Sequence, residues 1–564
     1  MRLFLFIILF QVHQLYAQEY KYLIHLTDKN NNGFSLSNPN TFLSSKSIDR
    51  RRKQNIKIDS TDLPVNSAYV DSLSSLPSIR ILNKSKWFNQ VLVSFSDTTI
   101  LQRINQFSFV QFSEPVNNNR RKKMTGIVPG IQTIKYNNAS AGSSQKSLKS
   151  FGVDTINYGA STGQIYIHNG EYLHHQGYHG EGMTIALLDD GFNNYLTNPA
   201  FDSIRSDNRI LGTYDFVNLK VSVNEEDQHG ADCFSIIAAN IPGTLVGAAP
   251  AASYWLFKTE DITSETPVEE QNWVAGAEFA DSVGVDLIST SLGYGYFDDS
   301  LYNLNYAKRN GHTSLVSKAA NFAVAKGMIV TASAGNSGGL TGEQKYILCP
   351  TDGDSVYAVG SVDATGIIAN SSSWGPNSSG QIKPDGVSVG EGAFFVAPDG
   401  NVNSGSGTSF SNPNLAGLIT CLWQAFPSFS SYDILSAVRS SSSLYSNPDN
   451  HYGYGIPDFE KAYTTLLNKR FAVYNQMLGN DWIRVYPVPF LQSFNLLFKP
   501  SMTGIANLQL MDISGKIIMK KSVPVTTGQL QLLVFDINQP LSTGVYFIRY
   551  SDRKESKTLK LLKN

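Results

Sequence analysis

Apolar and polar positions alternate in three different ways along the chain. Between residue 151 and about residue 470, apolar runs typical of buried strands alternate with helical stretches, which predicts a largely parallel sheet with helices on both faces. The clearest of these strands lie at 183–188, 285–289 and 328–332. After Arg470, short alternating segments are separated by turns such as Ser514-Gly515-Lys516, and this pattern predicts a small β-sandwich.

The N-terminal part has the pattern of a small α+β domain. Residues 19–115 contain strand-like segments at 20–26, 89–95 and 109–112 and helix-like segments at 44–55 and 99–107. The run Arg50-Arg51-Arg52-Lys53 lies in the first helix and is interpreted as a solvated helix face, with a processing site as the alternative. From 117 to 150 the chain is rich in Asn, Ser and Lys, which predicts an exposed linker.

The first residues have the pattern of an export signal. Arg2 precedes an apolar run at 3–10, and Ala17 before Gln18 marks the expected cut. This run is too short to span a bilayer, and no later stretch reaches the roughly 18 to 20 apolar residues of a transmembrane helix. We therefore expect an exported protein with no membrane span in its mature form.

Composition and charge narrow the class of protein. With 41% hydrophobic and 16% charged residues, the 564-residue chain is expected to fold rather than to be disordered. The net charge of -1 hides +11 over residues 18–150, -19 over 151–470 and +6 over 471–564. We expect no nucleic-acid partner. Three cysteines, Cys233, Cys349 and Cys421, are too few for a disulfide framework.

Four segments place polar residues where strands of the central region end or its helices begin. They are Asp189-Asp190-Gly191, Asp227-Gln228-His229-Gly230, Ser333-Ala334-Gly335-Asn336-Ser337-Gly338 and Gly405-Ser406-Gly407-Thr408-Ser409. Open α/β folds build their sites at such positions. Taken alone, each segment is more often a turn or a helix cap than a site.

Together the four segments fit acyl transfer by an activated serine. A hydroxyl becomes a good nucleophile when an imidazole accepts its proton, and the imidazole needs a carboxylate to fix its tautomer. Asp189, His229 and Ser409 supply these groups in that chain order, and Asn336 supplies an amide donor for the oxyanion.

The central region resembles the subtilisin-like serine proteases. The resemblance covers about residues 155–467 and rests on the segments above with Thr290-Ser291-Leu292-Gly293, Lys383-Pro384-Asp385-Gly386 and Gly407-Thr408-Ser409-Phe410-Ser411-Asn412-Pro413. It implies that Asp189 orients His229, that His229 is the general base and acid, that Ser409 is the nucleophile and that Asn336 completes the oxyanion hole. It also implies that Ser291, Leu292 and Gly293 pair with the extended backbone of polypeptide substrates.

The flanking regions resemble known companions of such proteases. Residues 19–116 resemble the inhibitory prosegment found in Bacteroidetes, and residues 484–564 resemble the C-terminal sorting domain of the type IX secretion system. The implied organisation is a signal peptide at 1–17, a prosegment at 18–116, a linker with the processing site at 117–154, a peptidase domain at 155–470 and the sorting domain at 484–564. Such a protein is made as an inhibited precursor and is secreted or attached to the cell surface. Its partners are its own prosegment and the secretion machinery.

Two residues near His229 affect the expected chemistry. Asp190 stands where Ser or Thr is usual, and a second carboxylate near His229 is expected to raise the pKa of the imidazole. Cys233 resembles the thiol beneath the catalytic His in one branch of the family, which makes mercurials candidate inhibitors. The reaction requires no cofactor. No spacing predicts zinc, and structural calcium, common in this family, has no assignable loop here, so metal sites stay unknown.

The sequence alone leaves alternatives from other classes of protein. One is a surface binding protein that kept the fold and lost turnover. A serine esterase would carry Gly-x-Ser-x-Gly and a late His, and the residues around Ser409 do not follow that pattern. For the C-terminal region, the alternative is a generic carbohydrate-binding or adhesive β-sandwich.

Overall fold

The computed structural model describes residues 19–117, 156–224, 227–537 and 540–564. The chain divides into two compact units, Met1–Tyr463 and Thr464–Asn564. The predicted signal peptide lies outside the described residues, and so does all of the predicted linker except Asn117. The signal peptide, the processing point and the domain limits therefore stay predictions.

The predicted prosegment is built on a four-stranded antiparallel sheet in the order β2-β3-β1-β4. Its elements are β1 (Tyr20–Leu26), α1 (Ser45–Lys53), α2 (Ser67–Ser74), β2 (Arg80–Ser85), β3 (Gln90–Phe95), α3 (Ile100–Ile104) and β4 (Val110–Asn117). The apolar core packs α2 and α3 against β1 and β3. The sequence pattern predicted β1 and β3 but missed β2, because its residues are mostly polar and have no regular alternation.

An arm, residues 27–66, leaves this sheet between β1 and α2 and carries α1. The interpretation of Arg50-Arg51-Arg52-Lys53 as a solvated face is wrong for half of the run. Arg50 and Arg51 are buried at 5% and 1% exposure, because they pair with Asp281 of the central domain, whereas the Arg52 side chain is 74% exposed.

The central domain has the predicted parallel sheet, with seven strands in the order β13-β12-β11-β10-β5-β9-β6. The strands are β5 (Thr184–Asp189), β6 (Ile210–Asp215), β9 (Ser253–Lys258), β10 (Leu287–Thr290), β11 (Ile329–Ser333), β12 (Tyr357–Val362) and β13 (Gly386–Val389). Short hairpins β7 (Asn240–Ile241) with β8 (Leu245–Val246) and β14 (Ala393–Val396) with β15 (Val402–Gly405) lie outside it.

Helices cover both faces of this sheet. The main ones are α7 (His229–Ala238), α8 (Pro267–Val283), α9 (Leu315–Ala325) and α10 (Thr408–Ala425), with shorter or peripheral α4 (Thr162–Tyr166), α5 (Glu171–His175), α6 (Asp202–Ser206), α11 (Ser431–Ser441) and α12 (Phe459–Leu478). Ile288 of β10 packs into the core under α8 and α9, while its neighbour Ser289 accepts a bond from Asn412 of α10. Alternate side chains of a strand point to opposite faces, so α10 covers the face opposite α8 and α9.

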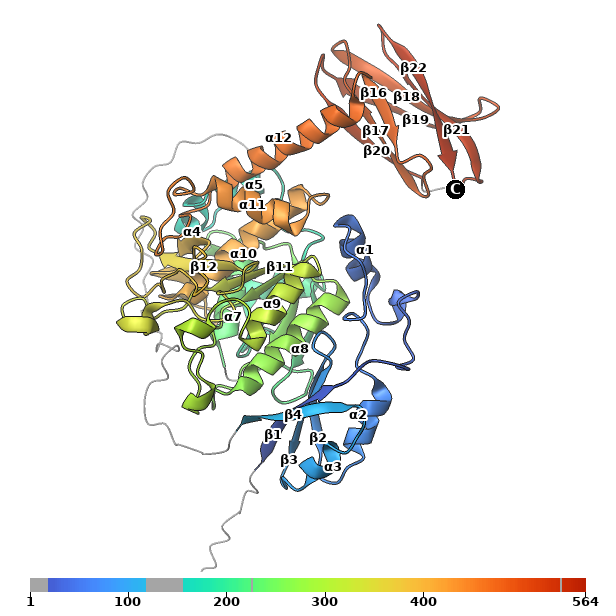
Figure 1. The fold of residues 1–564 in the computed structure, drawn as a ribbon. Helices are drawn as coiled ribbons and strands as arrows, with labels where there is room; N and C mark the ends of the chain where they lie inside the picture. Colours follow the sequence, from blue (N-terminus) through green and yellow to red (C-terminus); the bar gives the residue numbers. More distant parts are fainter. Residues whose placement is uncertain (1–18, 118–155, 225–226, 538–539) are drawn as a thin grey trace, which may run out of the picture. The chain divides into compact units, whose positions relative to one another are not determined.

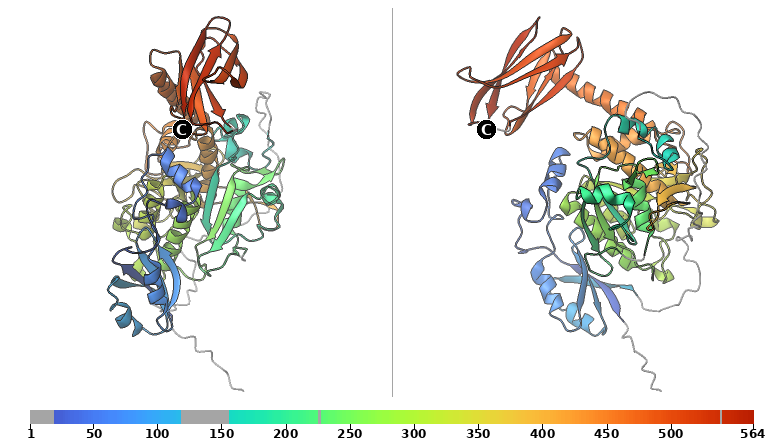
Figure 2. Two further views of the ribbon diagram at one scale, coloured as in Figure 1. Left: turned by 90° about the vertical axis from the view of Figure 1, so that its right-hand side faces the viewer. Right: turned by 180° about the vertical axis from the view of Figure 1, so that it is seen from behind.

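The prosegment sheet docks on α8 (Figure 1). Asn83 donates to Asn272 at 3.0 Å and Gln90 donates to Gln271 at 2.9 Å. Figure 2 shows the prosegment in blue beside the green part of the central domain from two further sides.

The C-terminal unit has two antiparallel sheets that share one apolar core. One sheet contains β16 (Ile483–Tyr486), β17 (Ser493–Phe498) and β20 (Gln531–Asp536), and the other contains β18 (Gly504–Asp512), β19 (Ile517–Val525), β21 (Gly544–Ser551) and β22 (Ser556–Lys563). The predicted fold class is confirmed: a mostly parallel α/β domain is preceded by a small α+β domain and followed by a β-rich domain.

Among the described residues, no helix is both long enough and apolar enough to cross a membrane.

Candidate active site

The predicted site residues lie at one edge of the sheet. Asp189 ends β5, Ser291 follows β10 directly and Asn336 lies three positions after β11. These three strands are parallel neighbours, so their carboxyl ends share an edge. His229 begins α7 and Ser409 is the second residue of α10, so all four chemical groups come from element ends.

The carboxylate of Asp189 fixes the imidazole of His229. Asp189 Oδ1 lies 2.7 Å from His229 Nδ1 and also accepts the backbone N–H of Asp190 at 2.9 Å. Burial alone would lower the pKa of His229, but the Asp189 carboxylate outweighs it and the pKa is raised well above the ordinary value. Asp189 thus holds one tautomer and stabilises the protonated ring.

Asp190 connects the two loops that carry this pair. Its Oδ1 accepts the backbone N–H of Gly230 at 3.0 Å, next to His229 in the first turn of α7. A side chain at Gly230 would collide with the carbonyl of Gly191, at 2.3 Å, so the close approach requires glycine there. Burial and the neighbouring Asp189 raise the pKa of Asp190 to about 7.

The hydroxyl of Ser409 points to Ser291 in this structure. Ser409 is 9% exposed, and its Oγ donates to the carbonyl of Ser291 at 3.3 Å, while Ser291 Oγ donates to the carbonyl of Ser409 at 2.9 Å. Cys233 Sγ lies 3.9 Å from His229 Nε2, and its thiol donates to the Ser409 carbonyl at 3.3 Å. The thiol therefore lies between the imidazole and the first turn of α10.

Asn336 has its amide oriented by the start of α10. Its Oδ1 accepts the backbone N–H of Thr408 at 2.8 Å and the Thr408 hydroxyl at 3.1 Å. A Cβ on Gly407 would lie 3.5 Å from Asn336 Nδ2, so glycine keeps the space beside this nitrogen open. This nitrogen therefore lies beside Gly407, two positions before Ser409.

The segment Ser291-Leu292-Gly293 follows β10 directly at the sheet edge, and Gly293 is exposed. Leu348 fills the space between this segment and Gly335. A Cβ on Gly293 would lie 3.1 Å from Leu348 Cβ, and one on Gly335 would lie 3.4 Å from Leu348 Cγ. Sequence reasoning missed Leu348, because a single leucine more than 50 residues from Gly293 carries no local signal.

Within the described residues, ligand atoms of Asp189, His229 and Cys233 lie within 4.8 Å of one another. The Asp189–His229 hydrogen bond already accounts for two of these groups. The three cysteines are free and buried, and burial raises the pKa of Cys233 to about 11. Structural calcium stays a prediction without assigned residues.

Comparisons with known proteins agree with the arrangement along the chain. Residues 21–126 match a model described as Peptidase S8 propeptide domain, Bacteroidota; residues 180–455 match Subtilase family; and residues 484–564 match Secretion system C-terminal sorting domain. Subtilisin DY of Bacillus licheniformis is 29% identical over 289 residues, which cover 51% of this chain and 93% of that protein. Subtilisin E of Bacillus subtilis is 28% identical over 294 residues, 51% of this chain and 68% of that protein. The crystal structure of MycP1 from Mycobacterium smegmatis matches with a TM-score of 0.43 at 18% identity, covering 56% of this chain and 89% of that one.

Proposed function

We propose, from the premise that the central domain of this chain belongs to the subtilase family, that Ser409, His229, Asp189 and Asn336 carry out its peptide-bond hydrolysis. The chain is a serine endopeptidase with a prosegment, and its C-terminal sorting domain indicates export by type IX secretion to the cell surface or the medium. The observation that supports the residue roles best is the 2.7 Å hydrogen bond between Asp189 and His229 at the sheet edge that also carries Ser409.

The proposed reaction starts with Ser409. Its hydroxyl turns from the Ser291 carbonyl toward His229 Nε2, which takes the proton as oxygen attacks the scissile carbonyl carbon. The carbonyl oxygen becomes negative and receives a hydrogen bond from Asn336 Nδ2. His229 then passes the proton to the leaving amine as the C–N bond breaks. Water next gives a proton to His229 and attacks the acyl carbon, and His229 returns that proton to the Ser409 oxygen as the ester bond breaks. Asp189 keeps Nδ1 protonated throughout.

Polypeptides are the proposed substrates. The segment Ser291-Leu292-Gly293 continues from β10, and its Ser291 is hydrogen-bonded to Ser409, so a substrate in extended conformation would pair with it as an added strand. Main-chain hydrogen bonds of this kind give affinity without selecting a side chain. We also propose the organisation into a prosegment at 18–116, a linker at 117–154 and a peptidase domain at 155–470.

A serine-specific label tests the assignment. Ser409→Ala should abolish both peptide hydrolysis and covalent labelling by a fluorophosphonate, because the nucleophile is lost. Ser411→Ala is the matched control, since this serine lies on the same helix and is fully buried, and it should label normally. Labelling that survives in Ser409→Ala would refute the nucleophile. A natural chain that neither labels nor hydrolyses would instead favour the binding protein that lost turnover.

A further inference from the structure

The arm contacts the catalytic domain at the edge opposite the active site. The helices α8 and α9 end at Val283 and Ala325, just before β10 and β11 begin at Leu287 and Ile329. Their C-terminal ends therefore lie at the amino edge of a sheet whose carboxyl edge holds the site. The arm packs on these helix ends. The side chain of Gln54 donates to the carbonyl of Gly327 and accepts the backbone N–H of Ser431, the first residue of α11.

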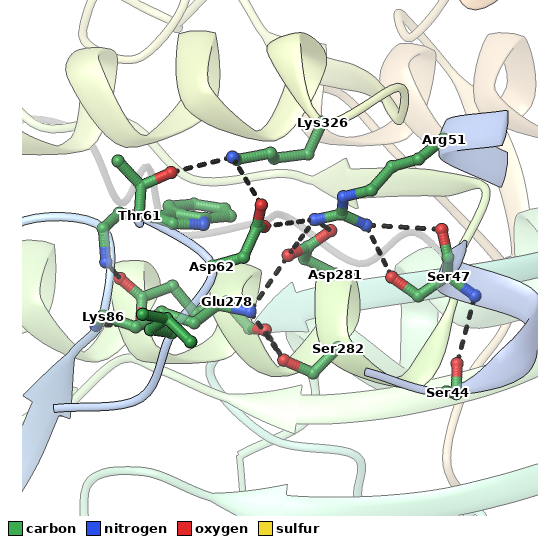
Figure 3. Close-up of polar contacts among 12 residues, drawn as sticks. Ser44, Ser47, Arg51, Thr61, Asp62, Lys86, Glu278, Asp281, Ser282 and Lys326 are labelled. Carbon is green, nitrogen blue, oxygen red and sulfur yellow. Dashed lines mark hydrogen bonds and ion pairs between the residues drawn. The ribbon is translucent and has the colours of Figure 1, made fainter. Parts of the chain in front are cut away.

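A buried ion network forms the centre of this contact (Figure 3). Asp281 of α8 binds three cations of the prosegment: Arg50 at 2.5 Å, Arg51 at 2.8 Å and Lys86 at 3.0 Å. Arg51 also pairs at 2.7 Å with Asp62 of the arm. The network thus alternates in charge across the interface, and the Arg51 and Asp281 side chains are 1% and 0% exposed.

The network continues to Lys326 at the end of α9. Its Nζ binds Asp62 at 3.1 Å and donates to Thr61 Oγ1 at 2.8 Å, so both contacts go to the arm. The Lys326 side chain is 4% exposed. Each domain therefore supplies both cations and anions. Separating the two domains breaks ion pairs in both directions.

Backbone carbonyls at the helix ends also accept hydrogen bonds from the arm. Arg50 donates to the carbonyls of Val285 and Lys326, which follow α8 and α9, where the helix dipoles favour a cation. Gly284, at φ +89°, leaves no room for a side chain, because a Cβ would lie 2.7 Å from Lys46 Cβ. The surface therefore fits a closely packed helix that carries adjacent arginines.

We propose that the arm is a second docking site of the prosegment, at the sheet edge opposite the active site, and that Arg51, Asp281 and Lys326 determine how long the cut prosegment stays bound. The proposal goes beyond the protease function, and the role of Ser409 enters only its test, as the substitution that prevents self-cleavage. The buried pairs act mainly on dissociation, because removing one partner leaves the other charge desolvated and unpaired. Docking of the prosegment sheet on α8 is a distinct contact and remains in an arm variant.

Full-length precursor that cannot cut itself allows a direct test. Ser409→Ala is combined with a recognition site for an added sequence-specific protease between residues 118 and 155. After cutting, the protein is immobilised by its C-terminal unit, and the release of the prosegment into buffer is followed over time. Arg51→Met is compared with Arg52→Met, whose exposed side chain pairs with Asp49 of the same helix.

Arg51→Met should shorten the half-life of the complex by about a hundredfold, and Arg52→Met should change it less than about threefold. Lys326→Met, which leaves the arm sequence intact, should also shorten it strongly, and this variant decides the question if Arg51→Met does not fold. Raising salt from 0.1 M to 1 M should leave the parent half-life almost unchanged, because buried pairs are poorly screened. If a folded Arg51→Met or Lys326→Met variant releases the prosegment as slowly as Arg52→Met does, the second docking site is refuted.

Discussion

Replacing Leu348 by alanine should widen the preference for the residue before the scissile bond. With the scissile carbonyl between Ser409 and Asn336, we expect the side chain of that residue to point toward Gly293 and Gly335. Leu348 fills this space and is 6% exposed. The parent enzyme should therefore prefer small residues such as alanine at this position and cleave slowly after phenylalanine.

The expected size follows from the volume released. Leu348→Ala removes three carbon atoms, and each apolar carbon that a substrate buries there contributes about 0.8 kcal/mol. About 2.4 kcal/mol of added transition-state binding corresponds to roughly fiftyfold in kcat/KM. The same change leaves a cavity in the free enzyme and should lower the free energy of unfolding by about 2 to 5 kcal/mol.

Two peptides that differ only in alanine or phenylalanine before the scissile bond provide the assay. The ratio of their kcat/KM values should shift toward phenylalanine by roughly fiftyfold in Leu348→Ala. Leu340→Ala is the matched control, because Leu340 lies in the loop after Asn336 and is 46% exposed, and it should leave the ratio unchanged. An unchanged ratio in a Leu348→Ala variant that still folds, as judged by circular dichroism, would refute the location of this pocket.

Three further changes test the catalytic groups. Asn336→Leu should lower kcat about a hundredfold to a thousandfold with little change in KM, because its amide acts when negative charge develops; steady-state kinetics with normal kcat would remove it from the oxyanion hole. Asp190→Asn removes a carboxylate near His229 and should lower the pKa of the imidazole. Because His229 must be neutral to act as base, the acid limb of the pH profile of kcat/KM should move to lower pH. An acid limb at the same pH would show that Asp190 does not affect the pKa of the base. An organomercurial should inhibit the parent and spare Cys233→Ala, since the thiol lies 3.9 Å from His229 Nε2; equal inhibition would point to another cysteine.

The elements that the sequence predicted well are those whose burial leaves a periodic apolar signal. β5 and β11 are buried along their whole length and read as continuous apolar runs. β2 is half exposed and mostly polar, so it gave no such signal and was missed. The strand predicted at 109–112 proved to extend over Val110–Asn117, because its later residues pair with β1 although their own pattern is polar.

The site was predictable to the extent that each group sits beside a strand end or a helix start. Asp189, His229, Asn336 and Ser409 all follow this rule, which is a property of open parallel sheets and can be read locally. The rotamer of Ser409, bonded to the Ser291 carbonyl, and the position of Leu348 depend on residues far apart in the chain. No local pattern encodes them.

The arginines of α1 show the same limit for charged residues. Ser47, Arg50 and Arg51 stand at spacings of three and four and form one buried face of a nine-residue helix, as apolar residues would in an amphipathic helix. Because this face is polar, a search for apolar periodicity reads it as solvated. The opposite charges of the N-terminal and central regions do predict mutual attraction. These net charges do not predict which cations become buried. That depends on the position of Asp281, which lies 230 positions after Arg51 in the chain. A run of four basic residues can therefore contain two that stabilise an interface and two that face water, as Arg51 and Arg52 do here.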